Sequence, residues 1–230
     1  MTFISRILGF LRDILIARIF GAGIATDAFF VAFRIPNLLR RLFAEGAFSQ
    51  AFVPILAEYK NTRTPEETRA LVDHITMLMG ITLIIVTAIG IVSAPLIIYL
   101  SAPGFSADTE KFDLTVALLR ITFPYILFIS LVALAGSILN TYGKFNVPAI
   151  TPALLNISFI ACALWLTPVF DPPILALAWA VFIGGILQLA FQIPFLLHLK
   201  LLPRIRLRNP DTGAGRDIKL MGPAIFGVSV

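Results

Sequence analysis

Four long stretches without a charged residue constrain this chain more than any other feature of its sequence. Each contains no Asp, Glu, Lys or Arg and is at least 22 residues long, at 75–102, 121–143, 149–170 and 173–197. About 20 apolar residues are enough to span the hydrocarbon core of a bilayer. A segment in lipid must satisfy its backbone hydrogen bonds internally, so each stretch is predicted to be a membrane-spanning helix.

The composition excludes several other classes of protein. Of the 230 residues, 58% are hydrophobic and 13% are charged, whereas about a quarter of the residues in a soluble domain are charged. An ordinary soluble enzyme and a disordered chain are therefore excluded. The single cysteine, Cys162, cannot form an intrachain disulfide, which excludes a disulfide scaffold.

The first 57 residues are also mostly apolar, but they carry charges. The longest uncharged run within the first 20 residues is five residues, too short for a signal peptide. We therefore expect two more membrane helices there and a transmembrane lobe of about six helices over residues 1–198. A basic cytoplasmic linker should follow at 199–219, and the start of a seventh, truncated helix at 220–230. The six predicted helices are 3–20, 26–57, 75–102, 114–142, 149–170 and 173–198.

The basic residues of the predicted loops indicate a cytoplasmic N-terminus. With that orientation, the inner loops 58–74, 144–148 and 199–219 hold ten Lys and Arg, while the outer loops hold one, Lys111. Such an excess on the cytoplasmic side is the usual pattern of membrane proteins. The net charge of +5 follows from these loops. We expect the basic loop 199–219 to be a cytoplasmic connector that faces anionic lipid. No nucleic-acid partner is expected, because the basic residues are neither grouped with aromatics nor set on a recognition helix.

Nine charged residues within the first two predicted helices indicate a polar cavity. A charge at the centre of a membrane helix costs about 2.5–3.5 kcal/mol, so it rarely faces lipid. Six Arg against three acids leave three positive charges, and the planar guanidinium binds phosphate oxygens in pairs. The pattern favours an anionic ligand with phosphate oxygens, although an arginine near a helix end can instead extend to the lipid headgroups. The nine residues are Arg6, Arg12, Asp13, Arg18, Asp27, Arg34, Arg40, Arg41 and Glu45.

Helical spacing does not decide whether these arginines converge. On the first helix Arg6 and Asp13 share a face, while Arg12 lies about 120° away. On the second helix Arg40 lies on a different face from Asp27.

The sequence lacks the usual signatures of a catalytic or metal site. Neither His74 nor His198 stands with Cys, Asp or Glu at the spacing of metal ligands, and no phosphate-binding glycine loop or nucleophile motif is present. We expect no enzyme activity and no metal. The acidic cluster at 108–113 is interpreted as a solvated loop. Four amide side chains inside the apolar stretches are predicted to form hydrogen bonds between helices: Asn140, Asn156, Gln188 and Gln192.

Several runs of residues, most of them in the first 54 positions, match one known family. They are SRILGFLRD at 5–13, FGAG at 20–23, TDAFFVAFR at 26–34 and PNLLRRLFAEGAFSQAFVP at 36–54, with TFPY at 122–125, PALLN at 152–156 and LALAW at 175–179. With these runs the chain resembles the MurJ (MviN) family of bacterial lipid II flippases.

The resemblance implies a fold and a set of site residues. The fold would be the N-terminal six-helix lobe of a multidrug/oligosaccharidyl-lipid/polysaccharide exporter-type transporter, an all-α polytopic helical bundle whose members have fourteen membrane helices. Carried over by position, the substrate-binding residues would be Arg6, Arg12 and Arg40. The supporting polar residues would be Asp13, Asp27 and Glu45.

The resemblance also implies an activity. The protein would move lipid II, the undecaprenyl-pyrophosphate-linked disaccharide-pentapeptide, from the inner to the outer leaflet of the bacterial cytoplasmic (inner) membrane by alternating access. Its partners would be lipid II and membrane lipids. No cofactor is expected, and the membrane potential or an ion gradient would supply the drive. Two alternatives stay open: a flippase for another polyprenyl-pyrophosphate-linked glycan, and a membrane-embedded lipid-phosphate enzyme.

Overall fold

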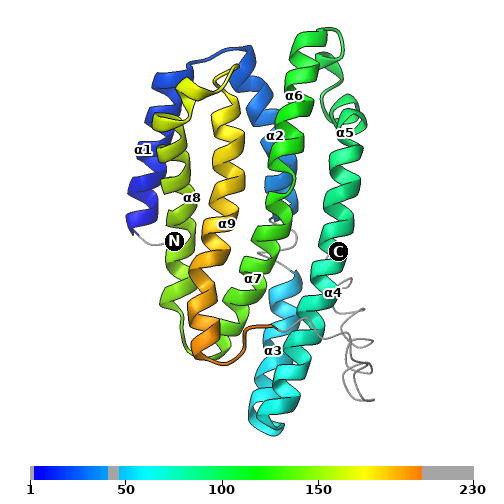
Figure 1. Cartoon of the computed structure of the whole chain (residues 1–230), viewed down its shortest axis with the longest axis vertical. Coiled ribbons are helices and arrows are strands. Elements are labelled where there is room, and N and C mark those ends of the chain that lie inside the picture. The colour runs from blue at the N-terminus through cyan, green and yellow to red at the C-terminus, as the bar shows by residue number, and fades with distance from the viewer. Residues whose placement is uncertain (1–2, 41–46, 204–230) are drawn as a thin grey trace.

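The described part of the chain is a bundle of helices. The computed structural model describes residues 3–40 and 47–203, without the side chains of 39, 40 and 47–51, and these ranges contain no strand (Figure 1). The α-helices are α1 (Phe3–Phe20), α2 (Ile24–Arg40), α3 (Ala47–Thr62), α4 (Pro65–Val92), α5 (Ala94–Ser101), α6 (Thr109–Thr122), α7 (Tyr125–Thr141), α8 (Asn146–Trp165) and α9 (Leu175–His198).

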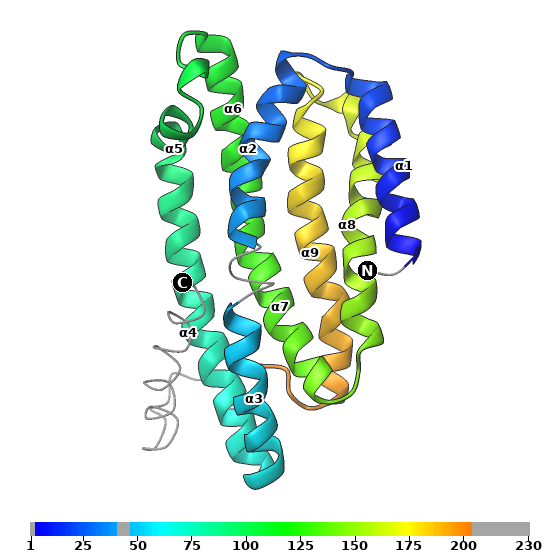
Figure 2. The ribbon, with the colours of Figure 1, turned by 180° about the vertical axis from the view of Figure 1, so that it is seen from behind.

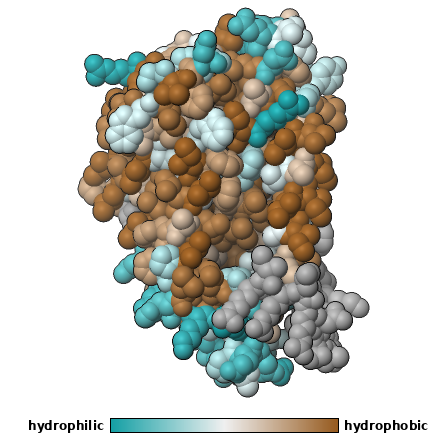
Figure 3. Space-filling view, in the orientation of Figure 1, coloured by the Kyte–Doolittle hydropathy of each residue, from teal (hydrophilic) through white to brown (hydrophobic). Residues whose placement is uncertain are grey.

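Four helical segments are long and apolar enough to cross a membrane. They are Pro65–Val92, Thr109–Thr141, Asn146–Trp165 and Leu175–His198. Figure 3 shows the matching surface, a hydrophobic band between two hydrophilic ends. The predicted all-α, polytopic membrane protein is thereby confirmed. Helices α1 and α2 do not reach the same criterion, since α1 carries four charged residues and α2 has only 17 residues.

The first two helices nevertheless belong to the bundle. Helix α1 packs on α8, and α2 packs on α6 and α7. Figures 1 and 2 show both lying along the long axis of the molecule beside these partners. The predicted helix 26–57 corresponds to α2 and α3, and residues 41–46 between them lie outside the described residues. The predicted linker from residue 204 onward and the predicted seventh helix lie outside them as well.

Other helices begin or end at residues different from those predicted, because of local capping and proline. Helix α4 begins at Pro65, ten residues before the uncharged stretch, because Thr64 and Glu67 form a capping box there. The Glu67 N–H donates to Thr64 Oγ1 at 3.2 Å, and Glu67 Oε2 accepts from the Thr64 N–H at 3.0 Å. The predicted helix 75–102 is divided into α4 and α5 just before Pro95, since proline lacks the N–H that would continue the helix.

The predicted helix 114–142 is likewise divided. It begins at Thr109, where the Asp108 side chain accepts a hydrogen bond from the Lys111 N–H, and it breaks before Pro124 into α6 and α7. Helix α8 begins at Asn146 and ends at Trp165, followed by a short 3-10 turn that contains a proline. Helix α9 keeps the predicted end at His198.

Two adjacent glycines let α9 lie close to its neighbours. A Cβ atom at Gly184 would lie 2.6 Å from Leu155 Cδ1 on α8, and one at Gly185 would lie 2.9 Å from Tyr125 Cδ2 on α7. Both distances are shorter than real carbon contacts allow. The pair therefore sets the spacing of α7, α8 and α9, as small residues commonly do in membrane helices.

We expect Gly184→Val to destabilise the protein, because the added side chain would overlap Leu155. Overpacking of this kind costs about 1–3 kcal/mol. The melting temperature of the detergent-solubilised protein should fall clearly. Gly80→Val on α4 is the matched control, because a Cβ there meets no atom within 4 Å. Equal melting temperatures for the two variants would contradict this account of the α8–α9 contact.

Candidate functional site: an arginine-lined cavity within the bundle

A cavity of about 840 Å³ lies among the helices of the bundle. Its size falls in the range of ligand pockets. Helices α1, α7, α8 and α9 contribute most of its wall, and α2 and α3 contribute three side chains, Phe33, Asn37 and Val53.

Among the residues whose side chains the structure describes, the charged ones that line the cavity all stand on α1. They are Arg6, Arg12 and Asp13, and the other lining residues are uncharged. Although Arg6 and Arg12 stand about 120° apart around the helix, both reach this large space. The structure thus brings together three of the six predicted site residues, with two positive charges against one negative.

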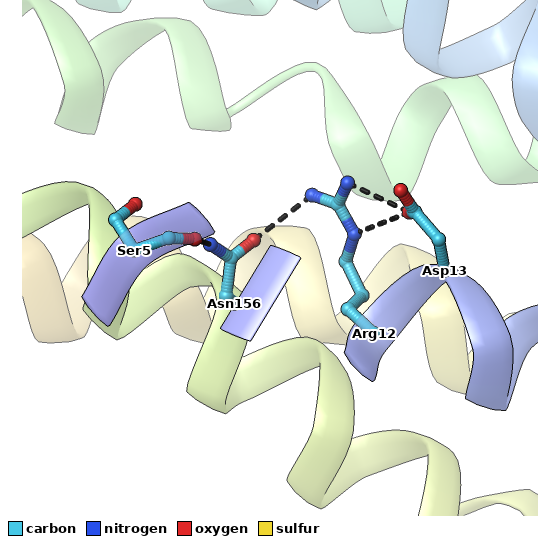
Figure 4. Close-up of polar contacts among 4 residues, drawn as sticks. All are labelled: Ser5, Arg12, Asp13 and Asn156. Carbon is cyan, nitrogen blue, oxygen red and sulfur yellow. Dashed lines mark hydrogen bonds and ion pairs between the residues drawn. The ribbon is translucent and has the colours of Figure 1, made fainter. Parts of the chain in front are cut away.

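Arg12 is held by a network that links α1 to α8 (Figure 4). Its Nε and Nη2 atoms donate to Asp13 Oδ1 at 2.9 and 2.8 Å, and its Nη1 atom donates to Asn156 Oδ1 at 2.9 Å. The guanidinium carbon lies 5.6 Å from the centre of the Phe159 ring, a favourable cation–π distance. These bonds use three of its five N–H groups. The other two have no partner among the described residues.

Asn156 fixes the direction of Arg12. The Asn156 side chain is buried, and its Nδ2 atom donates to the Ser5 carbonyl at 3.1 Å. With the amide nitrogen committed to Ser5, the amide oxygen faces Arg12. Asn156 lies near the middle of α8, ten residues after Asn146, so the Arg12 guanidinium lies near the middle of a candidate membrane span. The predicted hydrogen bond between helices at Asn156 is confirmed.

Arg6 lines the same cavity six residues earlier on α1. It is exposed and has no hydrogen-bond or ion-pair partner among the described side chains and backbone. Together, Arg6 and Arg12 offer N–H donors to an anion with several oxygen atoms.

The structure does not bring Asp27 to the cavity. Asp27 Oδ2 lies 3.8 Å from Lys111 Nζ, which in turn lies 4.0 Å from the centre of the Phe105 ring near the α5–α6 connection. The face of α2 that lines the cavity carries Phe33 and Asn37. Asp27 stands about 120° from Phe33 around the helix, so it lies on a different face from the one that lines the cavity.

The remaining predicted positions are less fully described. Arg40 is the last residue of α2, and its side chain lies outside the described part of the structure. Glu45 and Arg41 lie outside the described residues. Arg18 and Arg34 are exposed and do not line the cavity.

Helices α8 and α9 add an uncharged polar wall to the same cavity. Gln188 Nε2 donates to the Thr151 carbonyl and Gln192 Nε2 donates to Thr151 Oγ1, both at 3.1 Å. Tyr125 Oη lies 3.4 Å from Gln188 Oε1. The predicted bonds between helices at both glutamines are confirmed. Sequence reasoning missed Thr151 and Tyr125, and no sequence signal separates them from ordinary packing residues.

The acidic cluster at 108–113, interpreted from the sequence as a solvated loop, lies at the start of α6. Asp108 caps α6, and Glu110 stands in its first turn, a position that favours negative charge. Across the described ranges, no three His, Cys, Asp or Glu side chains gather as a metal ion would require.

Comparison with known proteins points to one family. A family described as lipid II flippase MurJ matches residues 16–230. The lipid II flippase MurJ of Burkholderia cenocepacia is 49% identical over 100% of this chain, and the "probable lipid II flippase MurJ" of Haemophilus influenzae is 48% identical over 100% of it.

A solved structure agrees with the sequence matches. It is titled lipid II flippase MurJ, inward closed conformation, and it aligns with a TM-score of 0.76 at 32% identity over 98% of this chain. The chain spans 46% of that structure, and 45% and 46% of the two relatives. The predicted transporter-type bundle is confirmed, and the chain belongs to the MurJ family.

Proposed function

We propose that this chain takes part in moving lipid II from the inner to the outer leaflet of the bacterial inner membrane. The observation that carries the proposal is the Arg12 guanidinium, held near mid-span with two N–H groups facing no described partner, in a cavity that it shares with Arg6. The names of its relatives supply the identity of the substrate.

The chemistry of the substrate fits this cavity. The head group of lipid II carries a pyrophosphate, sugars and a peptide, and burying its charges in hydrocarbon is very costly. Guanidinium groups bind phosphate oxygens through short, charge-assisted hydrogen bonds. We assign Arg6 and Arg12 to the pyrophosphate. Arg40 joins them in this proposal because position 40 follows Phe33 by seven residues, which returns to the cavity face of α2.

The proposed transport makes and breaks no covalent bond, so it needs no catalytic group or cofactor. The cavity would open alternately to either side as the lobes of the transporter rock. Moving an anion out of an inside-negative cell is favoured by about 2.3 kcal/mol per charge per 100 mV. Two charges at about 100 mV would gain about 4–5 kcal/mol. We propose that the membrane potential, or an ion gradient coupled to it, drives export.

The two alternatives are less well supported. Another polyprenyl-pyrophosphate-linked glycan would make the same pyrophosphate contacts, and the relatives' names favour lipid II. A lipid-phosphate enzyme would need acid–base or metal-binding groups beside the arginines, and Asp13 is the described acid that lines the cavity. Incubation with lipid II followed by product analysis separates these cases, because an enzyme would alter the lipid.

We also propose that the N-terminus faces the cytoplasm. Two of the predicted basic segments meet at the lower end of Figure 1, where Lys60 Nζ in the last turn of α3 donates to the carbonyl of Thr141, the last residue of α7, at 2.9 Å. The opposite end carries Lys111, which is paired with Asp27. This arrangement supports the excess of basic residues on the cytoplasmic side.

The prediction that tests the proposed function most directly concerns Arg12. In cells depleted of their own flippase, the gene encoding this chain should restore outer-leaflet lipid II, and Arg12→Ala should reduce that signal at least tenfold at equal protein level. Hydrogen bonds to charged groups are worth about 1.5–3 kcal/mol, which corresponds to this loss. Arg34→Ala, an exposed arginine of α2 that does not line the cavity, should retain activity. Full activity of Arg12→Ala would refute the proposal.

Another prediction concerns Asn156, which we expect to act through Arg12. Asn156→Leu should weaken lipid II binding about fivefold, since one positioning hydrogen bond is worth about 1 kcal/mol. The double variant with Arg12→Ala should bind no worse than Arg12→Ala alone. Additive losses in this cycle would show that Asn156 acts independently of Arg12.

A further prediction concerns orientation. In intact cells, an impermeant maleimide should label Ser106→Cys, near the α5–α6 connection, but not Thr62→Cys, at the end of α3. Both positions are exposed, and the native Cys162 is buried. Labelling of both variants after lysis is the control. The reverse pattern in intact cells would place the N-terminus outside.

A further inference from the structure

We infer that α8 and α9 form a second subsite in the cavity, which accepts hydrogen bonds from uncharged N–H or O–H donors of the substrate head group. The subsite consists of Gln188 and Gln192 on α9 and Thr151 on α8, all of which line the cavity. This inference rests on the proposed function, and it assigns the sugar and peptide part of the head group to a wall distinct from the arginines on α1.

The orientation of both glutamine side chains is fixed. Gln188 and Gln192 stand four residues apart, on one face of α9. Their Nε2 atoms donate to the carbonyl and the hydroxyl of Thr151. The Thr151 hydroxyl itself donates to the Val147 carbonyl at 3.0 Å, so it can only accept from Gln192. With both amide nitrogens engaged, the oxygens are the groups left to receive a donor.

One of these oxygens has no partner. Gln192 is 1% exposed, and its Oε1 atom receives no hydrogen bond from the described residues. Gln188 Oε1 has the Tyr125 hydroxyl at 3.4 Å, a long hydrogen bond. Buried acceptors without a donor are rare because they cost free energy. Two other buried oxygens in the described ranges lack a partner, on Thr87 and Ser130, but neither residue lines the cavity.

The chemistry of this wall selects against phosphate. Among the described side chains, those of α8 and α9 that line the cavity carry no charge. The amide N–H groups of Gln188 and Gln192 are already engaged with Thr151. Phosphate oxygens only accept hydrogen bonds, so they gain nothing from a wall of acceptors. Sugar hydroxyls and amide N–H groups of a glycopeptide are donors that would satisfy Gln192 Oε1. The cavity thus separates into an anion-binding side and a donor-binding side.

The test compares two ligands that share the pyrophosphate and the prenyl chain. Purified full-length protein is titrated with lipid II and with undecaprenyl pyrophosphate, which lacks the sugars and the peptide. Gln192→Met, similar in length but without an acceptor, should weaken lipid II binding at least fivefold. It should change undecaprenyl pyrophosphate binding less than twofold. Arg12→Ala should weaken the binding of both ligands.

A matched control separates binding from helix packing. Ser158→Ala removes another α8–α9 hydrogen bond, from Ser158 Oγ to the Ala180 carbonyl at 2.7 Å, on a buried residue that does not line the cavity. It should leave both affinities unchanged, whatever its effect on the melting temperature. If Gln192→Met does not fold, Thr151→Val, which releases the Gln192 amide, should give the same selective loss.

Each remaining outcome counts against a specific claim. Equal weakening of both ligands by Gln192→Met, or no weakening of either, would overturn the second subsite. A selective loss in Ser158→Ala as well would assign the effect to helix packing and would also overturn it. If the unsubstituted protein binds undecaprenyl pyrophosphate but not lipid II, the proposed function fails, and the inference fails with it.

Discussion

The free-energy cost of a charge in a membrane governs the arrangement of this bundle. The Arg12 guanidinium lies beside Asn156, near the middle of the candidate membrane span formed by α8, where a bare guanidinium would be very costly. The structure meets that cost with Asp13, Asn156 and the face of the Phe159 ring. Two N–H groups remain for a ligand, so the same network that keeps the arginine in the bundle also leaves it able to bind an anion.

That network depends on close packing elsewhere. Asn156 can reach α1 because α8 lies between α1 and α9. Helix α9 lies close to α8 and α7 because Gly184 and Gly185 carry no side chain. The same close contact of α8 and α9 brings Gln188 and Gln192 within hydrogen-bond distance of Thr151. The glycines of α9 therefore allow the uncharged polar wall of the cavity to form. The packing of α8 against α9 at the two glycines and the polar lining of the cavity therefore depend on the same close approach of these helices.

The described side chains of helix α2 that line the cavity are uncharged. They are Phe33 and Asn37. Asp27 instead pairs with Lys111 beside Phe105, so it joins α2 to α6 at the end of the bundle. An acid predicted to support the arginines thus lies in a different environment from Asp13.

The sequence by itself determined the class of fold and the importance of the first two helices. Uncharged stretches long enough to span a bilayer are predicted to be helices. The concentration of charged residues in the first two predicted helices indicates a polar interior. The sequence could not determine which charges meet, because helical spacing fixes angles within one helix and not the rotation of one helix against another. Only tertiary packing placed Asn156 beside Arg12, joined Thr151 to two glutamines and turned Asp27 away from the cavity. Those contacts join residues that are far apart in the chain, so they cannot be predicted from the local sequence pattern.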